Sequence, residues 1–279
     1  MKKCGILALV LTFAFYSTFV LHIVMASPHV DVDVNTAYQI IVTDRSSHPN
    51  LVILDVRTVS EFEAGHINQA ILIPVDELPQ RIDELSQYKN DEIIVYCQSG
   101  GRSNSASLTL DDNNFTTVFD MLGGLAAWID AGFPIEQSFE VTVGDLTFAV
   151  SILTNSTIDA FYFNMTSKQL SFTVAGTTAT TGFCNVSIPS NLMWGDFSLY
   201  MNDIELVEGA DYAETYNGTH YLFNINYIHS IHTIEMFSTE VIPDFTAWLF
   251  LPFLMTATLL GLALKRRLKK QRPMLNRKS

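Results

Sequence analysis

Short apolar runs alternate with helically spaced segments between residues 30 and 137 of this 279-residue chain. The apolar runs have the length of buried strands and are Leu51–Asp55, Ala70–Ile73, Glu92–Cys97 and Thr117–Phe119. The segments of helical character between them are 60–64, 75–85, 103–112 and 125–131. Because strands separated by helices form βαβ units, we predict an α/β domain with a central parallel sheet over residues 30–137.

A different pattern extends from residue 138 to residue 241. Apolar and polar residues alternate with a period of two at Gln169–Val174, His220–Ile225 and Thr233–Phe237. Turn residues such as Asn217-Gly218 separate these segments. The pattern predicts about eight short antiparallel strands, which would form an all-β sandwich domain over residues 138–241.

The N-terminal end has the order of a secretory signal. Lys2 and Lys3 precede an apolar run over residues 5–25, and the small residue Ala26 follows it. Residues 1–26 are therefore interpreted as a signal peptide. The run is long for a signal peptide, and an uncleaved signal anchor is the alternative. Both interpretations send the following chain out of the cytoplasm.

The C-terminal end predicts a membrane span. Residues 245–264 contain no charge, and at about 1.5 Å per residue such a helix crosses a hydrocarbon core of about 30 Å. A basic segment begins at Lys265, and basic flanks stay on the cytoplasmic side. We predict a transmembrane helix over 245–264 and a basic cytoplasmic tail over 265–279. The protein would then be a single-pass protein of the cell membrane, with both globular domains outside the cytoplasm.

Composition excludes several classes of protein. A hydrophobic fraction of 48% with 16% charged residues excludes an intrinsically disordered chain. Ten of the 16 Lys and Arg residues lie at the two ends, so the body between them has six basic and 29 acidic residues, a balance of −23. Nucleic-acid binding requires clustered basic residues, so we expect no nucleic-acid partner.

The few cysteines, the histidine spacing and the N-glycosylation motifs add further predictions for an exported chain. Of the three cysteines, Cys4 lies in the signal, and Cys97 and Cys184 are too few for a disulfide framework. Two histidines, His229 and His232, lie three apart in a segment interpreted as strand, where they would point to opposite faces, so we predict no metal site. Candidate N-glycosylation sites are Asn114, Asn155, Asn164, Asn185 and Asn217.

The candidate chemistry lies at the end of the third apolar run. Ligands of parallel α/β sheets bind where strands lead into helices, and here the chain reads Cys97-Gln98-Ser99-Gly100-Gly101-Arg102-Ser103. Two glycines allow a tight loop with inward N–H groups, the following helix directs its N-terminal dipole at the same point, and Arg102 adds a positive charge. All three effects stabilise a thiolate, so Cys97 is predicted to be a nucleophile with a lowered pKa.

A series of motifs in residues 30–137 resembles the single-domain rhodaneses. They are Leu54-Asp55-Val56-Arg57, Glu61-Phe62, Gly65-His66-Ile67, Ile73-Pro74, the 95–103 segment with Cys97, and Gly123-Gly124 with Trp128. The resemblance implies a rhodanese fold and a catalytic Cys97 that carries sulfane sulfur as a persulfide. It implies that Arg102 and the substrate-binding residues Gln98, Ser99, Gly100, Gly101 and Ser103 surround that sulfur. Asp55 and Arg57 match a structural motif and are carried over as supports.

The loop length separates two relatives of this fold. Four residues lie between Cys97 and Arg102, whereas the related phosphatases and arsenate reductases have five and form a wider cradle. The shorter loop favours sulfur transfer over phosphate transfer. His66 invites a Cys–His dyad interpretation, but its Gly-His-Ile motif is a structural turn in the family.

The second domain resembles the membrane-proximal domains and tails of archaeal surface proteins. The segments Phe183–Pro189 and Ser230–Ile234, then Ile242-Pro243-Asp244-Phe245 with the apolar span and basic end, carry the resemblance. It implies a sorting signal and an archaeosortase partner. Asp244 stands where that motif has Glu, and a plain membrane anchor is the alternative.

Two functions of different classes remain. One is an extracytoplasmic sulfurtransferase that moves sulfur from a small anionic donor, thiosulfate or polysulfide, through the Cys97 persulfide to a thiol or cyanide, with no cofactor. The other is a non-catalytic sensor or interaction module on a cell-surface protein. The Cys97 and Arg102 loop favours the enzyme, because a structural module does not require a charged thiolate cradle.

Overall fold

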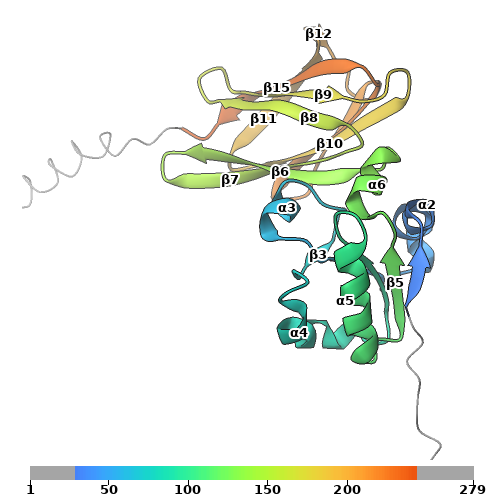
Figure 1. Cartoon of the computed structure of the whole chain (residues 1–279). Helices are drawn as coiled ribbons and strands as arrows, with labels where there is room; N and C mark the ends of the chain where they lie inside the picture. Colours follow the sequence, from blue (N-terminus) through green and yellow to red (C-terminus); the bar gives the residue numbers. More distant parts are fainter. Residues whose placement is uncertain (1–28, 244–279) are drawn as a thin grey trace, which may run out of the picture. The chain divides into compact units, whose positions relative to one another are not determined.

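The computed structural model describes residues 29–243 (Figure 1). The predicted signal segment, membrane span and basic tail lie outside these residues, as do Asp244 and Phe245 of the predicted sorting motif. Across the described part of the chain, no helix is long and apolar enough to cross a membrane. The chain divides into two compact units between Gln137 and Ser138.

The first unit is built on a parallel sheet with the strand order β1-β5-β4-β2-β3 (Figure 1). The predicted α/β class with a central parallel sheet is confirmed. Strand β1 has no counterpart among the predicted strands because three residues are too few to show a period. The strands are β1 (Val30–Val32), β2 (Val52–Asp55), β3 (Ile71–Leu72), β4 (Glu92–Tyr96) and β5 (Thr117–Met121).

Short helices connect these strands. The expected helix over 75–85 is instead a one-turn α-helix followed by a 3₁₀-helix. Pro79 explains the late start, because proline has no N–H and is tolerated only in the first turn of a helix. The helices are α2 (Val34–Tyr38), the π-helix η1 (Gln39–Thr43), the 3₁₀-helix η2 (Arg45–Ser47), α3 (Val59–Glu63), α4 (Leu78–Arg81), the 3₁₀-helix η3 (Ile82–Tyr88), α5 (Gly101–Asp112) and α6 (Gly124–Asp130).

Strand β4 is apolar from Ile93 to Tyr96 because both faces of the sheet are buried there. Ile93 and Val95 pack with residues of α4, η3 and α5 in one hydrophobic cluster. Ile94 and Tyr96 pack with residues of α2, η1 and α6 in a second cluster. Successive strand residues point to opposite faces, so the continuous run supplies two cores and brings the Cys97 that follows it to the edge of the sheet.

The second unit is rich in β-structure and contains two five-stranded sheets, with the orders β13-β14-β10-β7-β6 and β12-β11-β15-β9-β8. Side chains from both sheets form one hydrophobic cluster, so the two sheets share a core. The strands are β6 (Ile135–Val143), β7 (Leu146–Thr154), β8 (Thr157–Asn164), β9 (Gln169–Ala175), β10 (Thr181–Pro189), β11 (Met193–Met201), β12 (Ile204–Glu205), β13 (Tyr212–Tyr216), β14 (His220–Ile228) and β15 (Ile231–Val241).

These strands are more numerous and longer than the sequence pattern predicts. The alternation that predicts a strand is interrupted where strands bulge, as between Asp159 and Tyr162 in β8 and between Trp194 and Phe197 in β11. A bulge inserts an extra residue and shifts the apolar period by one position, so the pattern is lost although the strand continues.

Candidate active site

Cys97 follows β4 directly and lies beneath a tight loop. Gly100 closes this loop with φ of +104°, a left-handed conformation that glycine adopts readily, and α5 begins at the next residue. The Gly100 N–H donates a hydrogen bond to Cys97 Sγ at 3.1 Å. Only 2% of the cysteine is exposed, so the sulfur is placed at the base of the loop with backbone N–H groups around it.

These N–H groups change the acidity of the thiol. Burial raises the pKa of Cys97, but hydrogen bonds from the backbone of Ser103, Ser99 and Gly100 oppose this effect. The hydroxyl of Ser103, whose Oγ is 3.8 Å from Sγ, acts in the same direction as the N–H groups. The net pKa is below the ordinary thiol value, which favours the nucleophilic thiolate.

Arg102 forms an ion pair that the sequence does not predict. Its guanidinium donates to both carboxylate oxygens of Glu61, at 2.7 and 2.6 Å. Hydrogen bonds from Arg102 hold the pKa of Glu61 well below its usual range, although partial burial opposes them. Glu61 also closes a capping box with Thr58 at the start of α3. The Thr58-x-x-Glu61 spacing indicates that helix start, but nothing in the sequence indicates the partner 41 positions away.

The start of α6 supports the cysteine loop from behind. The Leu125 N–H donates to the Cys97 carbonyl at 2.8 Å, and the Ala126 N–H donates to the Gln98 carbonyl at 3.0 Å. Gly124 has φ of +58°, and a Cβ there would overlap the Cys97 carbonyl oxygen and lie 2.7 Å from the Gln98 carbonyl carbon. Because the carbonyls of Cys97 and Gln98 point toward the start of α6, the N–H groups of the loop face the sulfur.

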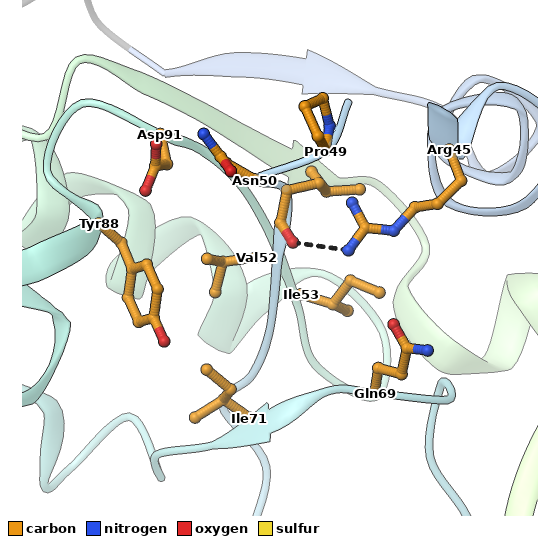
Figure 2. Close-up of a pocket in the computed structure, with 10 residues that line it drawn as sticks. Arg45, Pro49, Asn50, Val52, Ile53, Gln69, Ile71, Tyr88 and Asp91 are labelled. Carbon is orange, nitrogen blue, oxygen red and sulfur yellow. Dashed lines mark hydrogen bonds between the residues drawn. The ribbon is translucent and has the colours of Figure 1, made fainter. Parts of the chain in front are cut away.

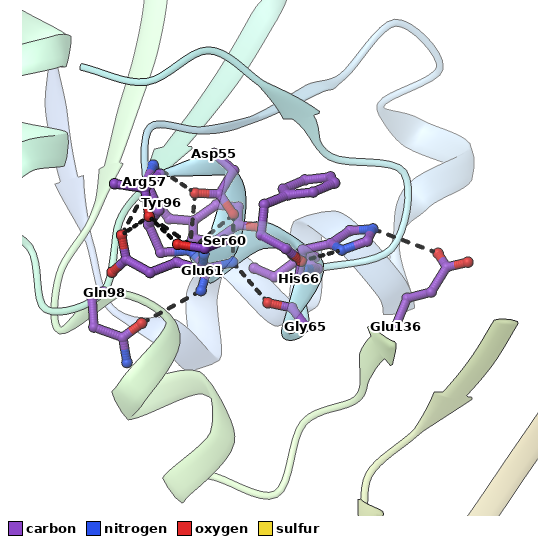
Figure 3. A network of polar contacts seen from close by, with 12 residues as sticks. Asp55, Arg57, Ser60, Glu61, Gly65, His66, Tyr96, Gln98 and Glu136 are labelled. Atoms are coloured by element: carbon purple, nitrogen blue, oxygen red, sulfur yellow. Dashed lines mark hydrogen bonds and ion pairs between the residues drawn. The ribbon is translucent and has the colours of Figure 1, made fainter. Parts of the chain in front are cut away.

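A buried ion pair holds the end of β2 beside this loop (Figure 3). Arg57 contacts both carboxylate oxygens of Asp55, with the shortest distance at 2.7 Å, and also donates to the Gly65 carbonyl at 2.7 Å. A longer bond of 3.4 Å reaches the side chain of Gln98. Arg57 therefore connects β2 with the turn after α3 and with the residue that follows Cys97.

His66 takes part in the turn and not in the thiol site. Its ring stacks on Phe62 with centroids 3.7 Å apart, and Nδ1 hydrogen-bonds the Phe62 carbonyl. Nε2 lies 4.0 Å from a carboxylate oxygen of Glu136 (Figure 3).

The other histidines are placed differently from the prediction. His229 lies in the turn between β14 and β15, so the argument from opposite faces of one strand is wrong. Its ring is buried between Ser156 and Thr180, at 2.8 and 2.6 Å, whereas His232 contacts Asn202 and the Ile228 carbonyl.

The remaining predicted residues are distributed over both units. Cys184 lies in β10, and burial raises the pKa of its thiol to about 12, so it is chemically quiet next to Cys97. Both cysteines are free thiols.

Among the sequons, Asn114 and Asn217 are exposed, and Asn164 and Asn185 are half-buried. Asn155 bonds the backbone of Thr181 and Phe183 through its side-chain amide. Glycosylation stays a prediction.

A pocket lies at the opposite edge of the sheet from Cys97 (Figure 2). It is lined by residues that precede or begin β2, β3 and β4, among them Asn50, Val52, Ile71 and Asp91. Arg45 donates to the Leu51 carbonyl at its rim. These are the amino ends of the strands, whereas ligands of parallel sheets bind at the carboxyl ends, so we assign no substrate to this pocket.

Comparison with known proteins covers the first unit. The rhodanese-like domain family matches residues 41–131. Thiosulfate sulfurtransferase 16 of Arabidopsis thaliana is 41% identical over 91 residues, which cover 29% of this chain and 76% of that protein. A sulfurtransferase of Allochromatium vinosum is 33% identical over 86 residues, covering 31% and 78%. YrkF of Bacillus subtilis is 39% identical over 82 residues, but the match covers only 43% of it.

A solved structure gives a similar match. The rhodanese-like domain of an Anabaena protein is 31% identical, with a TM-score of 0.35 and coverage of 40% of this chain and 80% of that one. A parallel sheet with a low-pKa cysteine in an N–H cradle between β4 and α5 defines an α/β protein with a thiolate site. The two sulfurtransferases described above match this chain over most of their own length. These matches show that the chain belongs to the rhodanese-like domain family.

Proposed function

We propose that the protein is a sulfurtransferase that carries sulfur as a persulfide on Cys97. The supporting observation is the Cys97 thiol at the base of the loop, with Gly100 N–H at 3.1 Å from Sγ and a lowered pKa. A thiolate held by N–H groups is nucleophilic, and the same groups stabilise a terminal persulfide anion. The names of the matched sulfurtransferases agree with this chemistry.

The proposed reaction has two steps. The Cys97 thiolate attacks the outer sulfur of thiosulfate, a bond forms between the two sulfurs, and sulfite leaves with the electron pair of the broken S–S bond. A thiol or cyanide then attacks the outer sulfur of the persulfide, and the Cys97 thiolate leaves and is regenerated. No electrons are required from another source, and Arg102 and the loop N–H groups balance the anionic charge at each stage.

Mass spectrometry tests this proposal. Thiosulfate is expected to add one sulfur, about 32 Da, to the peptide that contains Cys97, and cyanide is expected to remove it. Cys97→Ser is expected to lose the added mass, and the matched Cys184→Ser variant is expected to keep it. Failure to load the wild-type protein with thiosulfate or polysulfide would favour the non-catalytic interaction module.

The proposed location is the outer face of the cell membrane, with a signal at residues 1–26 and an anchor at 245–264. The basic residues that flank both apolar segments support it. Protease added to intact cells is expected to digest the region between residues 27 and 243 and to spare an epitope placed after Lys265. Digestion only after lysis would place both units in the cytoplasm. An archaeosortase that uses the sorting motif would cleave the chain near Pro243. Mass determination of the mature C-terminus detects this cleavage.

A further inference from the structure

Three acidic side chains and one histidine gather at the β1–β5 edge of the first sheet. Asp31 and Asp120 are paired residues of these adjacent parallel strands, so their side chains lie on the same face. His29 lies two residues before Asp31 and shares that face. Nitrogen or oxygen atoms of His29, Asp31 and Asp120 lie within 4.8 Å of one another. Asp111, from α5, completes the group.

Asp120 is the unusual member of the group. It is 1% exposed, and neither of its carboxylate oxygens has a hydrogen-bond partner within residues 29–243. Burial raises the pKa of Asp120, and the side chains of Ser103 and Asn104 only partly offset this effect because neither makes a hydrogen bond of normal geometry to the carboxylate oxygens. An ionised carboxylate buried without a partner is costly, so such a group stays protonated until it pairs with a cation or coordinates a metal.

The imidazole of His29 is oriented as a metal ligand would be. Asp111 Oδ2 lies 2.7 Å from His29 Nδ1 and accepts a further bond from the His29 backbone N–H at 3.1 Å. With the carboxylate on Nδ1, the Nε2 lone pair accepts only a long contact of 3.5 Å from Asn104 Nδ2, which a metal ion would displace, and Nε2 lies 3.9 Å from Asp31 Oδ1. Carboxylate–histidine pairs of this kind are the usual outer support of a metal-bound histidine.

From this geometry we infer a divalent metal site formed by His29 Nε2 and one oxygen each of Asp31 and Asp120. A cation at their centre supplies the partner that Asp120 lacks and neutralises carboxylates that otherwise face one another. One imidazole with two carboxylates suits a borderline ion such as Zn²⁺ better than Ca²⁺ or Mg²⁺, which prefer oxygen ligands alone. Bonds of about 2.0–2.2 Å require the three side chains to close inward, and the exposed Asp31 is free to do so.

Zinc binding to the full-length protein in detergent tests the site. The Cys97→Ser variant serves as the parent, so that the reactive thiolate does not bind zinc. After chelation and dialysis, a competition titration with a chromophoric chelator is expected to show one equivalent of Zn²⁺ that millimolar Mg²⁺ does not displace. Co²⁺ in its place is expected to give the visible absorption of a low-coordinate N/O site.

Substitutions separate this site from other zinc binding. Asp120→Asn and His29→Gln are each expected to weaken binding by more than about 100-fold, and Asp111→Asn by about 10–100-fold, as for outer-shell partners. The matched controls are Asp130→Asn, an exposed carboxylate, and His48→Gln, whose histidine pairs with Glu92. Both controls are expected to bind as the parent does.

Two results would overturn the inference. One is the absence of a stoichiometric site in the parent. The other is one equivalent bound equally well by Asp120→Asn and His29→Gln. Circular dichroism checks that each variant is folded. Asp31→Asn removes a proposed ligand at an exposed position, so it tests the site without changing the interior.

Discussion

The ion pair between Arg102 and Glu61 places two opposite charges beside the Cys97 loop. Arg102 interacts with the thiolate electrostatically, and Glu61 offsets part of that charge. Arg102→Ala is therefore expected to raise the pKa of Cys97, and Glu61→Gln to lower it. The rate of alkylation by iodoacetamide as a function of pH measures both shifts. Glu63→Gln, at an exposed position of the same helix, is the control, and equal pKa values in all variants would show that the pair does not act on the sulfur.

The same arginine is expected to contribute to turnover with thiosulfate. Arg102→Ala is expected to lower kcat/KM by on the order of 10²–10³-fold, the usual effect of removing one donor to a developing anion. Arg102→Lys is expected to recover part of the loss, because an ammonium keeps the charge but not the planar fork that contacts Glu61. Steady-state kinetics over a salt series measures this. Wild-type kinetics in Arg102→Ala would mean that the backbone N–H groups form the cradle alone.

At the scale of elements, the start of α6 determines the shape of the cysteine loop. Gly124→Ala is expected to displace the loop, because the added Cβ meets the Cys97 carbonyl and the residue has positive φ. The variant is expected to lose about 1–3 kcal/mol of stability and to form persulfide poorly. Denaturant unfolding and sulfur loading by mass spectrometry measure the two effects. Gly101→Ala, where a Cβ meets nothing within 4 Å, is the control for stability, and equal losses in both would contradict the packing argument.

The elements also show what could be predicted from the sequence. The apolar run of β4 and the Gly-Gly-Arg-Ser loop indicate the parallel sheet and the position of Cys97, because both depend on neighbouring residues. The role of Glu61, the packing against Gly124 and the cluster around Asp120 depend on residues brought together from separate segments. Local periodicity does not carry that information. Bulges hide strands such as β8 for the same reason, since the partner strand and not the local sequence maintains them.

At the scale of the whole molecule, the two units have separate hydrophobic cores. Clusters of residues between Val32 and Trp128 stabilise the first unit, and a cluster from Val141 to Val241 stabilises the second. Two unfolding transitions are therefore expected in denaturant. Cys184 reports on the second unit, because its buried, high-pKa thiol reacts only after that unit opens. Pulsed labelling of the Cys184 thiol measures the unfolding of the second unit. If the second unit unfolds in the same single transition as the first, the two cores are not independent.

Acid is expected to destabilise the second unit through His229. Burial, and then the charge of His232, lower the pKa of His229. The unfolded chain therefore binds more protons than the folded one below about pH 6.5, so stability is full above that pH and falls as pH decreases toward the lowered pKa. The slope is at most about 1.4 kcal/mol per pH unit from this group. His229→Gln is expected to reduce the slope and the half-buried His220→Gln to keep it, as denaturation at several pH values will measure.

The contrast between the two thiols determines how the chain withstands oxidants. Cys184 is buried, so thiol oxidation within residues 29–243 is concentrated on the thiolate of Cys97. Oxidation of a bare thiolate beyond the sulfenic acid is irreversible, whereas a persulfide is a reversible cap. If the protein has the proposed function, a molecule that already carries the Cys97 persulfide keeps Cys97 in a form from which the thiolate can be regenerated. The loaded state would then be the durable resting state of the protein.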